Sequence, residues 1–161
     1  NAGKSTLLSR LTQARPKIAD YPFTTLTPNL GLAKLQDFRT FVIADIPGLI
    51  KDAHKGRGLG YEFLRHIQRT RVLVFLLDVS AKDAKTQLAE LKKELELYDP
   101  ELLRKPQVVV LNKIDLMDRE HKFNLNGKKE KQYKISALTG EGIDKLITGL
   151  AKILEELGNE K

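Results

Sequence analysis

Two continuous apolar runs, at residues 72–77 and 108–111, constrain the fold of this chain more than any other feature. Neither run alternates with polar positions, which is typical of strands buried on both faces of a parallel sheet. Stretches with helical spacing of leucine separate and follow these runs, and parallel strands need such crossovers. The alternation predicts an α/β fold of three layers, α/β/α, with a mainly parallel sheet and right-handed crossovers.

Local periodicity predicts the other elements. Apolar residues recur at helical spacing in four segments, at residues 7–14, 59–67, 88–98 and 143–157. Shorter strands are predicted at residues 30–35, 39–44 and 133–135. The first two of these strands flank a short turn, so we expect an antiparallel hairpin that gives the sheet one antiparallel edge strand. Residues 17–29 and 46–60 lack a period and are expected to form loops.

The first predicted helix directly follows a string that matches the second half of the phosphate-binding pattern G-x-x-x-x-G-K-[ST]. In that pattern, backbone N–H groups hold the α- and β-phosphates, Lys4 reaches the β- and γ-phosphates, and the Ser5 hydroxyl ligates Mg²⁺. Gly3 would allow the backbone to approach a phosphate because it has no Cβ. The predicted contacts are Asn1, Ala2, Gly3, Lys4, Ser5 and Thr6. Alone, the string also fits a surface turn.

The first strand and first glycine of such a P-loop would precede Asn1. We therefore expect residues 1–161 to form a single P-loop NTPase domain that is cut inside its phosphate loop and lacks the first strand. Such a fragment should be unstable or bind nucleotide poorly, because a central strand and half of the loop are missing.

A second candidate segment, Asp45-Ile46-Pro47-Gly48, follows the predicted strand at residues 39–44. A carboxylate at this point can hold a water bound to Mg²⁺, and the Gly48 N–H can meet a γ-phosphate. An ordinary turn at the end of a strand would have the same composition.

Two further segments favour guanine as the base. Asn112-Lys113-Ile114-Asp115 follows the apolar run at residues 108–111, and Ser136-Ala137-Leu138 follows the last short strand. The Asp115 carboxylate can accept hydrogen bonds from guanine N1–H and the 2-amino group, whereas adenine offers neither donor. A site built on such an acceptor rejects the wrong base by a factor of about 10⁴. Asn112 would support the loop and the N7 edge, the Lys113 stem would cover the base, and a backbone N–H of residues 136–138 would meet O6.

Longer strings carry a family resemblance: Tyr21-Pro22-Phe23-Thr24-Thr25-Leu26-Thr27-Pro28-Asn29-Leu30-Gly31, Asp45-Ile46-Pro47-Gly48-Leu49-Ile50, Gly58-Leu59-Gly60 and Phe63-Leu64-Arg65-His66-Ile67. Over essentially all of its length, the chain resembles the Obg family of translation-factor-related P-loop GTPases. The resemblance implies a GTP-binding (OBG-type) domain that hydrolyses GTP to GDP and phosphate and acts as a molecular switch.

The resemblance also assigns the first switch loop. It implies that Thr25 ligates Mg²⁺ and senses the γ-phosphate, with Thr24 as the fallback. The nucleotide contacts of this loop are predicted at Phe23, Thr24, Thr25, Leu26 and Thr27. The predicted catalytic residues are Lys4, Thr25 and Gly48.

Two positions bear on the rate of hydrolysis. Leu49 follows Gly48 where Ras-like proteins carry the glutamine that orients the attacking water, so intrinsic turnover should be slow. Asn1 corresponds to an asparagine that helps to bind K⁺ in similar GTPases, although it could instead only shape the loop. The predicted cofactor is Mg²⁺, held by Ser5, Thr25 and a water on Asp45, joined by K⁺ in the case that Asn1 has the first of these two roles.

The net charge of +7 suits phosphate-rich partners, but the basic residues are spread along the whole chain. The resemblance implies a ribosomal large-subunit precursor or its rRNA as partner, besides GTP and GDP. We expect a cytoplasmic monomer without membrane insertion, since no apolar run is long enough to span a bilayer. Two alternatives stay open: a guanine-nucleotide sensor with negligible turnover, and an RNA-binding module with a vestigial nucleotide site.

Overall fold

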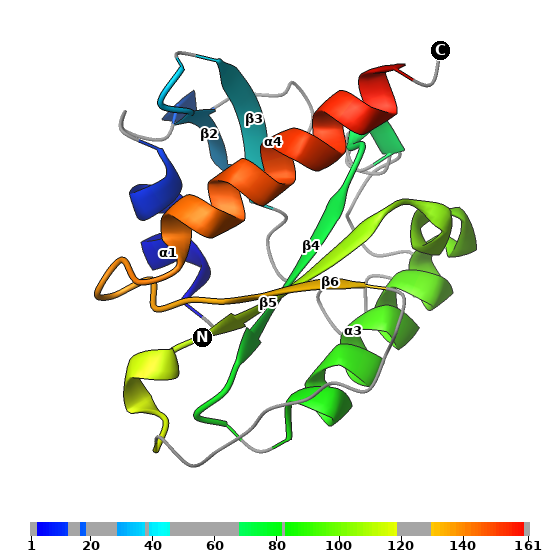
Figure 1. Ribbon diagram of the computed structural model, residues 1–161. Helices are drawn as coiled ribbons and strands as arrows, with labels where there is room; N and C mark the ends of the chain where they lie inside the picture. Colours follow the sequence, from blue (N-terminus) through cyan, green and yellow to red (C-terminus); the bar gives the residue numbers. More distant parts are fainter. Residues whose placement is uncertain are drawn as a thin grey trace.

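The computed structural model describes residues 3–12, 17–18, 29–37, 39–45, 68–81, 83–118 and 130–159. Along the chain the elements are α1 (Lys4–Leu11), β1 (Lys17–Ile18), β2 (Asn29–Lys34), β3 (Thr40–Asp45), β4 (Leu73–Asp78), α3 (Ala84–Tyr98), η2 (Pro100–Arg104), β5 (Gln107–Asn112), η3 (Ile114–Leu116), β6 (Lys131–Lys134) and α4 (Ile143–Asn159). Figure 1 shows their arrangement.

Strands β4, β5 and β6 form a parallel sheet in that order, which confirms the parallel sheet predicted from the two apolar runs; β6 corresponds to the short strand predicted at residues 133–135. The central strand β5 is the most buried, because residues 108–111 are all 0% exposed. Its register pairs Asp78 at the end of β4 with Asn112 at the end of β5. The parallel pairing therefore brings the carboxyl ends of these strands, and the residues that follow them, to one edge of the sheet.

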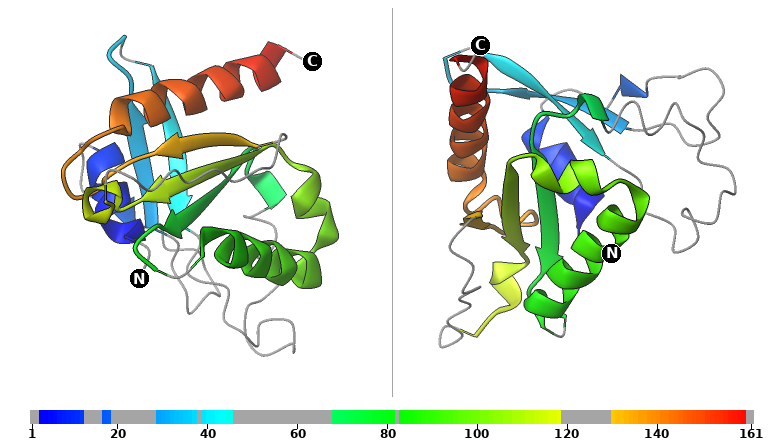
Figure 2. Two further views of the ribbon diagram at one scale, coloured as in Figure 1. Left: turned by 60° about the horizontal axis from the view of Figure 1, so that its bottom comes forward. Right: turned by 90° about the vertical axis from the view of Figure 1, so that its right-hand side faces the viewer.

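Helices cover both faces of the parallel sheet. Val108 and Val110 pack against α1 and α4, while Val109 and Leu111 on the opposite face pack under α3. Figure 2 shows α4 and α3 on opposite sides of the strands. The alternation of adjacent β5 side chains between two helical layers explains why the run is apolar without a break. Among the described residues, no helix combines the length and apolar character needed to cross a membrane.

Strands β1, β2 and β3 form a second, antiparallel sheet. The predicted hairpin is confirmed, with Leu32 opposite Val42. The prediction of one sheet with a single antiparallel edge strand is wrong for the described residues, because periodicity shows that a segment is a strand but not which strand it pairs with. The predicted loop is also wrong at β1, where Lys17 pairs with Leu30. A strand of two residues is too short to show a period.

Helix boundaries follow local signals. Helix α3 ends at Tyr98 before Asp99-Pro100, as predicted, and the Asp99 carboxylate accepts a hydrogen bond from the Glu101 N–H at the start of η2. Helix α1 begins at Lys4, directly after Gly3, and ends at Leu11. The helix predicted over residues 59–67 lies outside the described residues.

Candidate functional site

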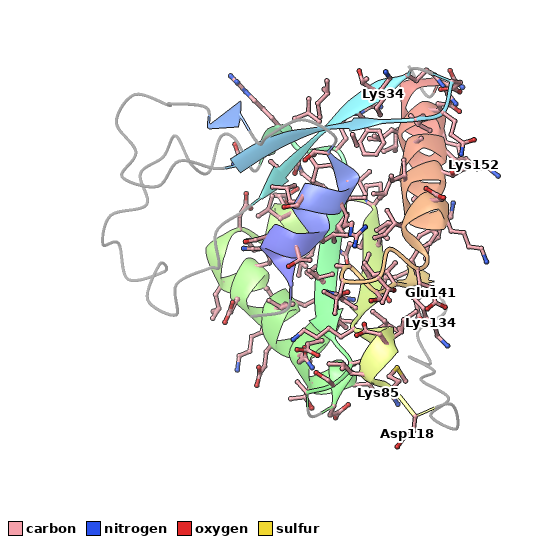
Figure 3. The ribbon with its side chains drawn as sticks, turned by 90° about the vertical axis from the view of Figure 1, so that its left-hand side faces the viewer. Lys34, Lys85, Asp118, Lys134, Glu141 and Lys152 are labelled. Carbon is pink, nitrogen blue, oxygen red and sulfur yellow. The ribbon has the colours of Figure 1, made fainter. Side chains whose placement is uncertain are left out.

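The segments singled out by their motifs converge at the carboxyl edge of the parallel sheet. Gly3 before α1, the end of β5 and the loop between β6 and α4 lie side by side, because a Cβ on Gly3 would meet Asn112 and the Ala137 N–H donates a hydrogen bond to Asn112. In Figure 3, Lys85 at the start of α3 and Asp118 beyond η3 lie at the same end of the molecule, and Lys34 lies at the opposite end. In open α/β sheets this carboxyl edge is where ligands bind.

Gly3 is the last residue before α1 and has a φ of 87°. Its carbonyl accepts a hydrogen bond from the Leu7 N–H at 2.9 Å, so the helix starts immediately. A methyl group in place of the Gly3 hydrogen would lie 2.5 Å from Asn112 Nδ2. Both the left-handed backbone and the close approach therefore require glycine. Lys4 is half-buried, while Ser5 and Thr6 in the first turn are exposed.

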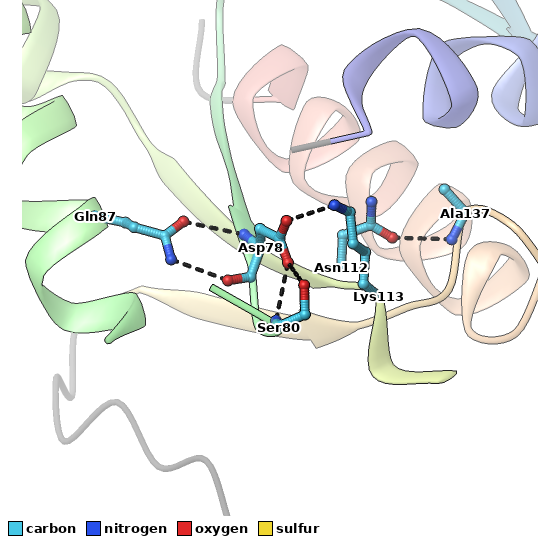
Figure 4. Close-up of polar contacts among 6 residues, drawn as sticks. All are labelled: Asp78, Ser80, Gln87, Asn112, Lys113 and Ala137. Atoms are coloured by element: carbon cyan, nitrogen blue, oxygen red, sulfur yellow. Dashed lines mark hydrogen bonds and ion pairs between the residues drawn. The ribbon is translucent and has the colours of Figure 1, made fainter. Parts of the chain in front are cut away.

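Asn112 lies between Gly3 and the loop after β6, and Figure 4 shows its bond to Ala137. Its side chain is 1% exposed, and its Oδ1 accepts a hydrogen bond from the Ala137 N–H at 2.9 Å. Its Nδ2 lies on the Gly3 side. Because a buried amide held in this way has little freedom, Asn112 fixes the end of β5 to the loop after β6 and leaves no room for a side chain at Gly3.

Asp115 and Ser136 come from the two predicted base-binding segments and contact each other. The Ser136 hydroxyl donates a hydrogen bond to Asp115 Oδ1 at 2.6 Å, and it accepts one from the Thr139 N–H at 3.1 Å. Ser136 is fully buried, whereas Asp115 and Leu138 are exposed. The buried serine thus orients a carboxylate that faces solvent.

Lys113 has a positive φ of 70°, and its Nζ lies 2.5 Å from Asp78 Oδ2. The other carboxylate oxygen of Asp78 accepts hydrogen bonds from the backbone N–H and the hydroxyl of Ser80, at 2.9 Å and 2.5 Å. Gln87 of α3 bonds the backbone of Asp78 through both ends of its amide, at 3.1 Å and 2.9 Å. The lysine head group is therefore held by a carboxylate that is itself fixed on two sides (Figure 4).

Burial and the hydrogen bonds from Lys113 and Ser80 together change the pKa of the Asp78 carboxyl group. Partial burial alone would raise the pKa of its carboxyl group, but the hydrogen bonds from Lys113 and Ser80 outweigh burial and lower the pKa below its usual value. Asp78 is therefore ionised at neutral pH and can hold the Lys113 ammonium group.

The motifs missed four side chains that support the site: Arg10, Asp78, Ser80 and Gln87. Asp78 could have been found, because it directly follows the apolar run at residues 72–77 and so ends a buried parallel strand. Arg10 and Gln87 carry no comparable signal, since each lies within an amphipathic helix and outside any recognisable motif.

Several predicted site residues lie outside the described residues: Asn1, Ala2, Phe23, Thr24, Thr25, Leu26, Thr27, Ile46, Pro47, Gly48 and Leu49. Asp45 ends β3, but only its backbone is described. Ile114 begins η3, and its N–H donates to the Ile135 carbonyl at 3.2 Å. Within the part that is described, no group of three or more acidic, histidine or cysteine side chains could hold a metal ion.

Residues 1–113 match the family model described as "50S ribosome-binding GTPase". The chain is 57% identical to GTPase Obg of Aquifex aeolicus (strain VF5) over all of its own length and 49% of that protein. It thus spans about half the length of this relative.

Solved structures with the same fold include a nucleolar GTP-binding protein 1 of Plasmodium falciparum, with a TM-score of 0.69 and 22% identity over 99% of this chain and 84% of that one. The G domain of the FeoB iron transporter of T. maritima gives a TM-score of 0.68 and 20% identity over 94% and 92%. At these identities the two structures support the α/β G-domain fold alone.

Proposed function

Because the chain belongs to the 50S ribosome-binding GTPase family, and within it to the Obg GTPases, we propose that it binds GTP and hydrolyses it slowly to GDP and phosphate. The observation that carries the proposal is the convergence of Gly3, Asn112, Asp115 and Ser136 at one edge of the sheet. These residues come from three motifs far apart in the sequence. Their contacts support one nucleotide site, with residues 1–161 predicted to form a single domain.

Guanine recognition is assigned to Asp115. Its carboxylate would accept hydrogen bonds from N1–H and the 2-amino group of guanine, and Ser136 holds one of its oxygens at 2.6 Å. An orienting hydroxyl reduces the conformational freedom that the carboxylate loses on binding. Adenine has an acceptor at N1 and no 2-amino group, so it would leave the carboxylate without donors.

The phosphates are assigned to the amino end of α1. The helix begins at Lys4 directly after a glycine, so its first N–H groups are directed toward the chain end where a phosphate loop would lie. Lys4 would reach the β- and γ-phosphates, and the Gly48 N–H would meet the γ-phosphate. Thr25 would report whether that phosphate is present, so that GTP orders the two switch loops and hydrolysis releases them.

The residues assigned to Mg²⁺ fit this ion, because Ser5, Thr25 and Asp45 all offer oxygen ligands. Ser5 is exposed in the first turn of α1, where a bound phosphate would also lie. The ion would neutralise charge on the β- and γ-phosphates. K⁺ beside Asn1 remains a proposal that depletion of K⁺ from the assay would test.

Slow turnover follows from Leu49, since an apolar side chain cannot orient the attacking water. We expect an intrinsic rate on the order of 10⁻⁴ s⁻¹, as for unassisted Ras. A sensor without turnover is the alternative. Single-turnover phosphate release, measured in K⁺ with and without large ribosomal subunits, separates the two, because a sensor would release phosphate no faster than a protein-free blank.

The partner is proposed from the family to be a precursor of the large ribosomal subunit, which would place the activity in the cytoplasm. The main rival is an RNA-binding module that does not use a nucleotide. In the full-length protein, Asp115→Ala should abolish binding of GDP, and ADP should not bind either variant. Equal binding of GDP before and after the substitution would contradict the proposal.

A further inference from the structure

We propose that Arg10 is a positioning residue that orients the loop at residues 136–138 toward the guanine base. The inference rests on the function proposed above, and it concerns a side chain that belongs to none of the nucleotide motifs. Arg10 lies on the exposed side of α1, in the last turn of the helix whose first residue is Lys4. It therefore connects the element assigned to the phosphates with the loop assigned to the base.

The guanidinium group of Arg10 bonds two consecutive peptide carbonyls. Arg10 Nε donates a hydrogen bond to the Ala137 carbonyl at 3.1 Å, and Nη2 donates one to the Leu138 carbonyl at 2.5 Å. The guanidinium group is planar and rigid, so two such bonds fix the direction of both carbonyls. A lysine could make only one of them with the same geometry.

The direction of these carbonyls sets the direction of an N–H group. The Ala137 carbonyl and the Leu138 N–H belong to one peptide unit, and in a trans peptide they point in opposite directions. With its carbonyl held by Arg10, this peptide must direct the Leu138 N–H away from α1. The bond to a cationic donor also polarises the peptide, which makes its N–H a stronger donor.

The neighbouring N–H groups of this loop are already used within the protein. The Ala137 N–H donates to Asn112 Oδ1, and the Thr139 N–H donates to Ser136 Oγ. Among the described residues, the Leu138 N–H donates to no acceptor. Leu138 is also 69% exposed. We therefore assign the Leu138 N–H as the donor to guanine O6 and Arg10 as the side chain that aims it.

The affinities for three nucleotides distinguish a positioning role of Arg10 from a general structural role. GDP carries O6 and the 2-amino group, 6-thio-GDP has a weaker acceptor at position 6, and IDP lacks the 2-amino group read by Asp115. In the full-length protein, Arg10→Met should lower GDP affinity about tenfold, the loss expected for one hydrogen bond to the base. The preference for GDP over 6-thio-GDP should shrink, while the preference for GDP over IDP should stay the same. Arg10→Lys should lie between.

Arg104→Met is the matched control, because Arg104 is an exposed arginine whose ion pair with Glu101 lies on η2. It should leave all three affinities unchanged. If Arg10→Met does not fold, as judged by thermal unfolding, Arg10→Lys carries the same comparison.

An equal loss of affinity for GDP, 6-thio-GDP and IDP would overturn the positioning role, since it would indicate a general disturbance of the site. A wild-type protein that prefers GDP to ADP, together with an unchanged GDP to 6-thio-GDP ratio in Arg10→Met, would overturn the Arg10 proposal alone. A wild-type protein with no preference for GDP over ADP would overturn the proposed function and, with it, the inference.

Discussion

Gly3 and Asn112 meet where the first turn of α1 approaches the end of β5, and each restricts the other. Gly3 has a backbone conformation that residues with a Cβ rarely adopt, and the space that a Cβ would fill is taken by Asn112 Nδ2. Asn112 is in turn held by its bond to the Ala137 N–H. The requirement for glycine therefore comes from the protein's own packing, in addition to the proposed approach of a phosphate.

Gly3→Ala should destabilise the fold by about 2 kcal/mol, because the residue keeps a strained φ and displaces a buried amide. Affinity for GDP should fall at least tenfold as Asn112 moves. Gly158→Ala is the control: an added methyl group there would lie 4.0 Å from its nearest neighbour, Arg71 Nη2. It should be neutral or stabilise α4 by up to about 1 kcal/mol. Equal effects of the two substitutions on stability and affinity would contradict the account.

The contribution of the Asp78 carboxylate to stability should depend on pH. Its pKa is lowered in the folded protein, so its contribution to stability is present above the unfolded pKa of about 3.9 and is lost as the pH falls through the folded pKa. Asp78→Asn should therefore cost about 1–3 kcal/mol at pH 7, and this difference from the wild type should shrink below about pH 4.

Chemical denaturation of Asp78→Asn and wild type between pH 7 and pH 3 measures this difference. Glu101→Gln removes the charge of an exposed ion pair with Arg104 and should have little effect at pH 7. If the wild type instead became more stable relative to Asp78→Asn as the pH falls, the pKa of Asp78 would be raised on folding and not lowered.

At the scale of elements, α4 is held against the parallel sheet by a close fit to β6. Leu146 and Leu150 of α4 belong to the same buried cluster as Val108 and Val110, and Tyr133 of β6 packs against that cluster. A methyl group at Gly149 would overlap the phenol ring of Tyr133. Gly149 therefore sets how closely the last helix approaches the strand that carries the loop at residues 136–138.

Gly149→Ala should destabilise the protein by about 1–3 kcal/mol, even though alanine favours helix more than glycine does. In a Tyr133→Ala background the overlap is removed, so the same substitution should stabilise the protein by up to about 1 kcal/mol. A double-mutant cycle measured by denaturant unfolding gives the coupling. An identical effect of Gly149→Ala in both backgrounds would rule out this contact as the cause.

Most elements could be predicted from the sequence, because their signals are local. The apolar run that became β5 and the leucine spacing of α3 each identify one element without reference to the rest of the chain. Pairing is different: Lys17 lies opposite Leu30 in the sheet, and although residues 30–35 show a strand pattern, the neighbourhood of Lys17 shows none. The separation of the strands into two sheets was missed for the same reason.

The residues of the candidate site also differ in whether a local sequence signal identifies them. Gly3, Asn112, Asp115 and Ser136 could be found because each lies in a short motif after a predicted strand or before a predicted helix. The side chains that support these residues could not be found in this way. Arg10, for example, contacts the loop at residues 136–138 although it lies 127 positions from Ala137 in the sequence. Nothing near Arg10 in the chain distinguishes it from other exposed cationic residues.

In the whole molecule, the helical layers on the two faces of the parallel sheet determine where the candidate site lies. Helix α3 on one face and helices α1 and α4 on the other fix the parallel strands, and the residues that follow those strands meet at a single edge. Family membership and this convergence both support a guanine-nucleotide site. The chain spans about half of its Aquifex relative, and the ribosomal partner is proposed from the family.

The most direct test is a reversal of base preference at Asp115. Xanthine carries an oxygen where guanine carries the 2-amino group, so an asparagine amide should accept xanthine in place of guanine. Equilibrium binding of GDP, XDP and ADP to the wild type and to Asp115→Asn measures the preference. We predict that the wild type binds GDP and that Asp115→Asn binds XDP better than GDP, with ADP bound by neither. Unchanged preference for GDP in Asp115→Asn would contradict the central claim.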